Sequence, residues 1–94
     1  MIRVIIERHI APTLEIPYEE TAKRTLQKAV QVSGFISGET LKNTVDHNHR
    51  VILSTWRSLQ DWQRWYTSDE RKEMLAELSP MLEREEHITA LEIS

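Results

Sequence analysis

Alternation of apolar and polar residues opens the chain and predicts a β-strand. Ile2, Val4 and Ile6 fall on one face and Ile5 on the other, which is the period of two typical of strands. Three later runs are rich in β-branched and apolar residues and are bounded by turn-forming groups. The predicted strands are residues 1–10, 35–43, 49–56 and 87–93.

Helical periodicity fills the spaces between these strands. Over residues 18–32 apolar side chains recur at helical spacing, with Pro17 where a first helical turn tolerates proline and Gly34 as a natural residue to end it. Two further helical segments are predicted after the third strand. Ser58 and Ser68 are expected to cap their first turns.

The resulting order is strand, helix, two strands, two helical segments and strand. This βαββαβ order predicts an α+β, ferredoxin-like fold with a four-stranded antiparallel sheet and all helices on one face. The chain has 94 residues, which provide one hydrophobic core. We therefore expect a single domain over residues 1–94.

The predicted sheet has apolar residues on both faces. Ile5 falls on the opposite face from Val4, and Ile52 falls on the opposite face from Val51 and Leu53. Helices cover only one face, and a chain of this length has no spare element for the other. A second copy of the chain, packed sheet to sheet, is the simplest cover, so we expect a homodimer.

Composition narrows the classes of function. The chain has no cysteine, which excludes a disulfide scaffold, a Cys-ligated zinc site, an iron–sulfur cluster and thiol catalysis. A formal net charge of −3 without a basic cluster gives no reason to expect nucleic-acid binding. The sequence contains no leader pattern and no apolar run of membrane-spanning length. We expect a cytoplasmic protein without a membrane partner.

Two longer runs, SGETLKN and VILSTWRSLQDWQRWYTSDERKEMLAELSPMLE, resemble the antibiotic biosynthesis monooxygenase superfamily. The sharpest elements are Trp56 followed by Arg57 and Ser58, then Trp62 and Trp65. The resemblance covers nearly the whole chain. It implies a dimeric α/β barrel, and among its members are oxygenases that need no metal or added cofactor and enzymes that degrade haem.

Position by position, the resemblance carries over only in part. In the cofactor-independent oxygenases, Trp56 matches the Trp that closes the third strand, whereas Ile52 and Trp62 stand where an Asn and a Tyr are expected. In the haem-degrading members, the helical Trp is matched by Trp65. Glu7 and Leu75 replace the Asn and the His of those members, so the axial iron ligand is missing.

Trp56, Trp62 and Trp65 lie within ten residues of one another and are the main candidate binding residues. They can line an aromatic pocket for a flat apolar ligand, with Trp56 next to the reacting atoms. They can equally form a core and dimer-interface cluster, because aromatic residues dominate both. A pocket and a core can share these walls.

Titratable and charged residues on or next to the strands are further candidate site residues. His9, on the same side of its strand as Glu7 and Arg3, is the best candidate for a general base, although an exposed or interface pair fits equally. Arg50 and Arg57 flank the third strand. Arg50 is predicted to hold an anionic group of a substrate, and both arginines also suit a surface position.

Two polar runs are interpreted as ordinary surface. Asp46, His47 and His49 offer metal-ligand types at short spacing, but a solvated hairpin tip has the same composition, and we expect no metal site. The run 83–86, Glu-Arg-Glu-Glu, is interpreted as a solvated helix end and loop.

Three hypotheses of function follow. The first is a cofactor-independent monooxygenase acting on a small aromatic or quinol-type substrate in a pocket between sheet and helices. The second is a non-catalytic dimeric module that binds a small apolar or aromatic molecule. The third, haem binding with degradation, is disfavoured by the replacements described above.

Overall fold

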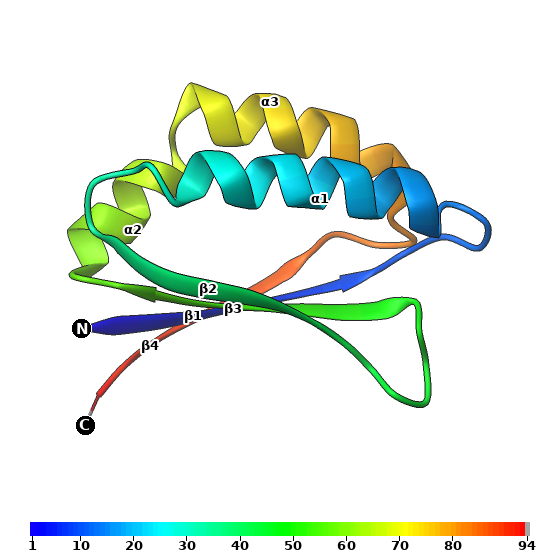
Figure 1. The fold of residues 1–94 in the computed structure, drawn as a ribbon, viewed down its shortest axis with the longest axis horizontal. Helices are drawn as coiled ribbons and strands as arrows, with labels where there is room; N and C mark the ends of the chain where they lie inside the picture. Colours follow the sequence, from blue (N-terminus) through cyan, green and yellow to red (C-terminus); the bar gives the residue numbers. More distant parts are fainter. Residues whose placement is uncertain (94) are drawn as a thin grey trace.

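The computed structural model describes residues 1–93 and has the predicted element order (Figure 1). The strands are β1 (Ile2–His9), β2 (Phe35–Lys42), β3 (His49–Trp56) and β4 (His87–Glu92). The helices are α1 (Glu15–Ala29), α2 (Leu59–Tyr66) and α3 (Asp69–Leu78), followed by the short 3₁₀ helix η1 (Ser79–Met81). The α+β, ferredoxin-like prediction is confirmed.

The four strands form one sheet in the order β2-β3-β1-β4, with every neighbouring pair antiparallel. In Figure 1 the helices all lie on one side of this sheet. We call the helix-covered side the inner face and the other side the outer face. Because side chains alternate along a strand, the register assigns each strand residue to one of these two faces.

The inner face carries the core. Ile2, Val4 and Ile6 of β1 are buried beneath the helices, while Ile5 between them is only half-buried on the outer face. A second group of buried side chains packs at the other end of α1, where Ile10 meets residues of α1 and α3. The core therefore consists of two hydrophobic clusters, one beneath α2 and one between α1 and α3.

Local sequence explains the boundaries of the helices. Ser58 Oγ accepts the backbone N–H of Asp61 and Ser68 Oγ accepts that of Arg71, so both predicted caps are confirmed. Helix α1 covers Glu15–Ala29 instead of the predicted residues 18–32, so it begins and ends three residues earlier than predicted.

The outer face keeps an apolar patch in the single chain. We call this set the outer patch; Ile5, Val51 and Leu53 are half-buried in it, and Leu41 and Leu91 are exposed. Its members alternate with charged and imidazole side chains along β1 and β3. The prediction that both faces of the sheet carry apolar side chains is confirmed.

Candidate functional site

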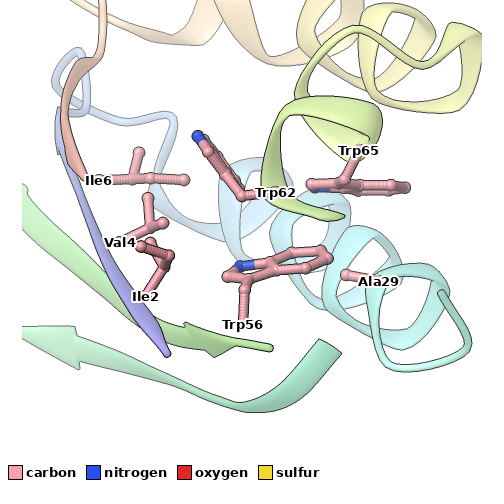
Figure 2. Close-up of a cluster of buried hydrophobic side chains, with 7 residues drawn as sticks. All are labelled: Ile2, Val4, Ile6, Ala29, Trp56, Trp62 and Trp65. Carbon is pink, nitrogen blue, oxygen red and sulfur yellow. The ribbon is translucent and has the colours of Figure 1, made fainter. Parts of the chain in front are cut away.

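A cavity of about 40 Å³ lies between the inner face of the sheet and the helices. Three tryptophans form one of its walls: Trp56 comes from the end of β3, and Trp62 and Trp65 come from α2 (Figure 2). Except for two arginines and a few hydroxyl groups, its lining is apolar. The volume is enough for a few water molecules.

The tryptophans also belong to the core. Trp56 is almost fully buried, and its indole N–H donates to Ser54 Oγ at 3.1 Å. Its ring meets the ring of Trp62 edge-on at 5.7 Å between centroids, and the ring of Phe35 at 5.3 Å. Such edge-to-face contacts add to the stabilisation from burial. The two interpretations of this cluster, pocket wall and core, therefore describe the same side chains.

Helix α2 is held in place by Asp61, which is buried at its first turn. Arg57 and Arg64 donate to its two carboxylate oxygens at 3.0–3.2 Å. The hydroxyl of Ser58, which donates to Asp61, and the guanidinium of Arg57 lower the pKa of that carboxyl below its ordinary value. These bonds orient the helix that presents Trp62 to the cavity.

Gly34 leaves the space that this carboxylate fills. Its φ is +93°, in the left-handed region that favours glycine. A Cβ atom at Gly34 would lie 2.3 Å from the carboxyl carbon of Asp61. A side chain at position 34 would therefore displace the group that anchors α2.

A buried ion-pair group closes the other end of the cavity. Arg8 of β1 donates from Nε to one oxygen of Glu86 at 2.9 Å, and Arg71 of α3 donates to the other oxygen. The side chains are 2%, 3% and 7% exposed for Arg8, Arg71 and Glu86, respectively, and both arginines line the cavity. Arg8 also donates to the hydroxyl of Tyr18 at 3.3 Å. We call these three charged residues the arginine bridge.

The position of Glu86 corrects one sequence interpretation. Residues 83–85 are exposed, as predicted for a solvated run, but Glu86 points inward and binds both arginines. A pattern of consecutive charges does not reveal this, because the partners lie 78 and 15 residues away along the chain.

Sequence reasoning also missed Arg8 and Arg71 as site residues. Each has a signal in its local pattern. Arg8 follows Ile6 in the inner-face alternation of β1, and Arg71 precedes Met74 by one helical turn on the buried side of α3. A charged residue in an apolar periodic position is the informative observation, because buried charge is costly unless it is paired.

Arg50 lies outside the cavity, in a groove of about 410 Å³ between α1 and β2. It donates to Glu19 at 2.9 Å, and its guanidinium carbon is 5.9 Å from the centre of the Tyr18 ring. Cavity and groove share Ala22, Leu26 and Thr40 in their walls, so they adjoin. Arg50 therefore lines a groove that adjoins the cavity, whereas Arg57 is paired with Asp61.

The structure does not bring His9 together with the tryptophans. Its register partner is His49, and the two imidazoles stack at 4.8 Å on the outer face. Glu7 is on the same face, with carboxylate oxygens 3.8 Å from His49 Nε2 and 3.7 Å from His87 Nδ1. Glu7 therefore does not occupy the cavity position that the resemblance assigns to an Asn, and Ile6 and Arg8 face the cavity instead.

No cluster of three potential metal ligands occurs among residues 1–93. The hairpin tip instead forms local turn bonds: Asp46 accepts the backbone N–H of Asn48, and the backbone carbonyl of His47 accepts from Arg50. Within the same residues, every helix is too short or too polar to cross a bilayer.

Comparison with known proteins places this geometry among related folds. A conserved protein from Methanosarcina mazei superposes with a TM-score of 0.90 at 20% identity, covering 96% of this chain and 89% of that protein. An antibiotic biosynthesis monooxygenase gives a TM-score of 0.91 at 12% identity, covering 100% and 99%. SnoaB, a cofactor-independent oxygenase from Streptomyces nogalater, gives 0.87 at 12% identity, covering 98% and 91%.

At such identities these likenesses show the fold alone. No match was found among curated proteins. The sequence profile for antibiotic biosynthesis monooxygenase, however, matches residues 1–77, which contain β1 to β3, the three tryptophans and both arginines of the arginine bridge. The chain belongs to the antibiotic biosynthesis monooxygenase family.

Proposed function

We propose that the chain is a monooxygenase that oxidises an electron-rich aromatic molecule of quinol or anthrone type, without metal or added cofactor, in the cavity behind Trp56. The observation that supports this most is the cavity wall of Trp56, Trp62 and Trp65 on the helix-covered face, in a chain of this family. Aromatic walls suit a flat ligand and exclude water from it.

The reaction needs no external reductant. For an anthrone-type methylene group, loss of a proton leaves a carbanion whose electron pair reduces dioxygen and forms a carbon-bound peroxide. Loss of water from the protonated peroxide then leaves a carbonyl group, so one oxygen atom enters the product and the other enters water. The protein has to desolvate the anion and stabilise it.

A ring-sized substrate needs more room than the cavity of about 40 Å³ provides. The adjoining groove between α1 and β2 supplies it, and the half-buried Leu26 and Phe35 stand on the cavity side of that groove. Arg50 and Lys23 line the groove and can attract an anionic substituent of the substrate.

Oxygen uptake with a panel of anthrones and hydroquinones tests the proposal. We expect uptake of one molecule of oxygen per anthrone consumed, a rate unchanged by a chelator, and a loss of at least about tenfold in the Trp62→Ala variant. An absence of uptake with every member of the panel would exclude the activity on these substrates.

The role of His9 as proton acceptor stays a prediction. The sheet separates its ring from a substrate in the cavity, because His9 lies on the outer face beside His49. The His9→Ala variant decides the matter. A rate lowered at least about tenfold supports general-base catalysis by His9, and an unchanged rate excludes it.

The second candidate is a non-catalytic module that binds a small aromatic molecule. It is favoured by Ile52 and Trp62, which line the cavity at the positions where the resembled oxygenases have an Asn and a Tyr. A ligand-induced rise in melting temperature without oxygen uptake would identify this function. For haem, Leu75 lies in a different pocket from the tryptophans. A haemin titration without a new Soret band would exclude haem binding.

We also propose that a second copy covers the outer patch, through its half-buried Ile5, Val51 and Leu53. An apolar surface in the middle of an otherwise polar sheet face is typical of a contact between subunits. A symmetric contact would bring the sheets of the two copies together and close the barrel expected of the family.

A further inference from the structure

The arginine bridge has an excess of positive charge at the cavity. Arg8 and Arg71 supply two guanidinium groups, and Glu86 supplies one carboxylate to share between them. The described lining of the cavity contains both arginines and no acidic residue. One positive charge is therefore left without a protein counter-charge on a wall that is otherwise largely apolar.

Besides Glu86, the two arginines contact aromatic side chains. The Tyr18 hydroxyl accepts from Arg8, and the guanidinium carbon of Arg71 lies 4.8 Å from the centre of the Tyr66 ring and 5.9 Å from that of Trp62. Aromatic faces attract a cation but do not neutralise it. These contacts hold the guanidinium groups in place and leave the charge excess unchanged.

The cost of this arrangement indicates a ligand. Burying an ionised group is unfavourable unless an opposite charge and hydrogen bonds compensate it. Each guanidinium has more N–H groups than the bonds to Glu86 and Tyr18 engage. A planar oxyanion in the cavity would accept from these groups and balance the charge.

We propose, on the basis of the function proposed above, that the ligand binds as a planar aromatic anion. Its carboxylate or phenolate oxygen accepts hydrogen bonds from Arg8 and Arg71, while its ring contacts the tryptophan wall and extends into the adjoining groove, which supplies the room that the cavity lacks. The arginine bridge therefore selects the ionised form of an acidic aromatic molecule over a neutral one of the same shape. Glu86 is a positioning residue that holds the two guanidinium groups side by side.

The experiment compares 2-naphthoate with 2-naphthamide, which have nearly the same shape and differ in charge. Isothermal titration of the full chain at neutral pH measures both affinities without turnover. We expect naphthoate to bind at least about tenfold more tightly than naphthamide. Equal affinities, or no binding of naphthoate at millimolar concentration, would overturn the proposal.

Variants separate the charge from the packing. Arg71→Met keeps the length of the side chain and removes the charge, and we expect it to weaken naphthoate binding at least about tenfold with less than about a threefold change for naphthamide. Naphthoate binding unaffected by Arg71→Met would contradict the site.

Arg24→Met is the matched control. Arg24 is 61% exposed on α1, where it pairs with Glu77, so its removal should leave both affinities unchanged. Circular dichroism establishes that each variant is folded, and Arg8→Met replaces Arg71→Met if the latter is not. Binding is measured without turnover, so the two proposals can fail separately. Selective binding of naphthoate without oxygen uptake would contradict the proposed oxygenase activity and still support the anion site.

Discussion

The two faces of the sheet combine apolar and charged side chains in opposite ways. On the inner face the helices of the same chain cover the strand residues: Val4 is fully buried, and Arg8 is paired with Glu86. On the outer face Ile5 is only half-buried, and the carboxylate of Glu7 is 42% exposed with imidazoles at 3.7–3.8 Å. The comparison teaches that burial on the inner face is intramolecular, whereas the outer face keeps apolar side chains that the proposed second copy would cover.

The largest expected difference between the two faces is in the free energy of unfolding lost when one side chain is truncated. We expect Trp56→Ala to lower the free energy of unfolding by about 3–5 kcal/mol, because it removes a large side chain that is only 1% exposed. At dilutions that keep copies apart, Leu91→Ala on the outer face should cost less than about 1 kcal/mol, since Leu91 is 47% exposed. Urea denaturation followed by circular dichroism measures both. Similar losses for the two variants would show that the two faces do not differ in how much they stabilise the single chain.

The charged groups give the second contrast. Glu86→Gln leaves two buried guanidinium groups without their carboxylate, and we expect it to lower the free energy of unfolding by about 3 kcal/mol. The same change at Glu77, whose pair with Arg24 is exposed, should cost less than about 1 kcal/mol. If both cost the same in urea denaturation, the arginine bridge is not a stabilising element.

A charge placed in the outer patch tests whether this patch forms the proposed dimer contact. Leu53→Glu puts a carboxylate beside Ile5 at the proposed contact, and we expect the dissociation constant of the dimer to rise at least about thirtyfold, equivalent to about 2 kcal/mol. Sedimentation at several concentrations measures it, and an exposed leucine on α2, Leu59→Glu, serves as the control. A wild-type chain that sediments as a monomer at micromolar concentration would exclude the dimer.

The smallest expected effect is the loss of stability at low pH that is due to Asp61, the residue that anchors α2. Bonds from Ser58 and Arg57 lower the pKa of Asp61 in the folded chain, so its contribution to stability is present above its ordinary pKa of 3.8 and is lost as the pH falls below that value. We expect the stability of Asp61→Asn to fall less steeply in this range. Parallel pH curves for wild type and variant would show that Asp61 does not contribute.

Elements of the fold were predictable because local patterns determine them. The range of β3 agrees with the predicted residues 49–56, since a β-branched run between turn residues leaves little freedom. Strand β2 ends one residue before Asn43, whose side chain accepts the backbone N–H groups of Val45 and Asp46 and starts the turn. Boundaries depend on such turn bonds, which composition does not specify.

The site was less predictable, because its parts come from distant segments. The spacing of the tryptophans singled them out and they line the cavity, whereas Arg50 lies in the adjoining groove. Glu86 was misinterpreted as solvated, and His9 faces away from the cavity. Alternation along β1 does separate His9 from Ile6, but which face the helices cover follows only from the assembled sheet.

The arginine bridge also has a consequence for the order of folding during synthesis. Glu86 and β4 leave the ribosome after β1, α1 and α3, and only then does a carboxylate reach Arg8 and Arg71. Until that moment, closing the helices over the sheet would bury two guanidinium groups without their counter-charge. A nascent chain that has not yet exposed Glu86 should therefore remain open on its inner face and close in one late step.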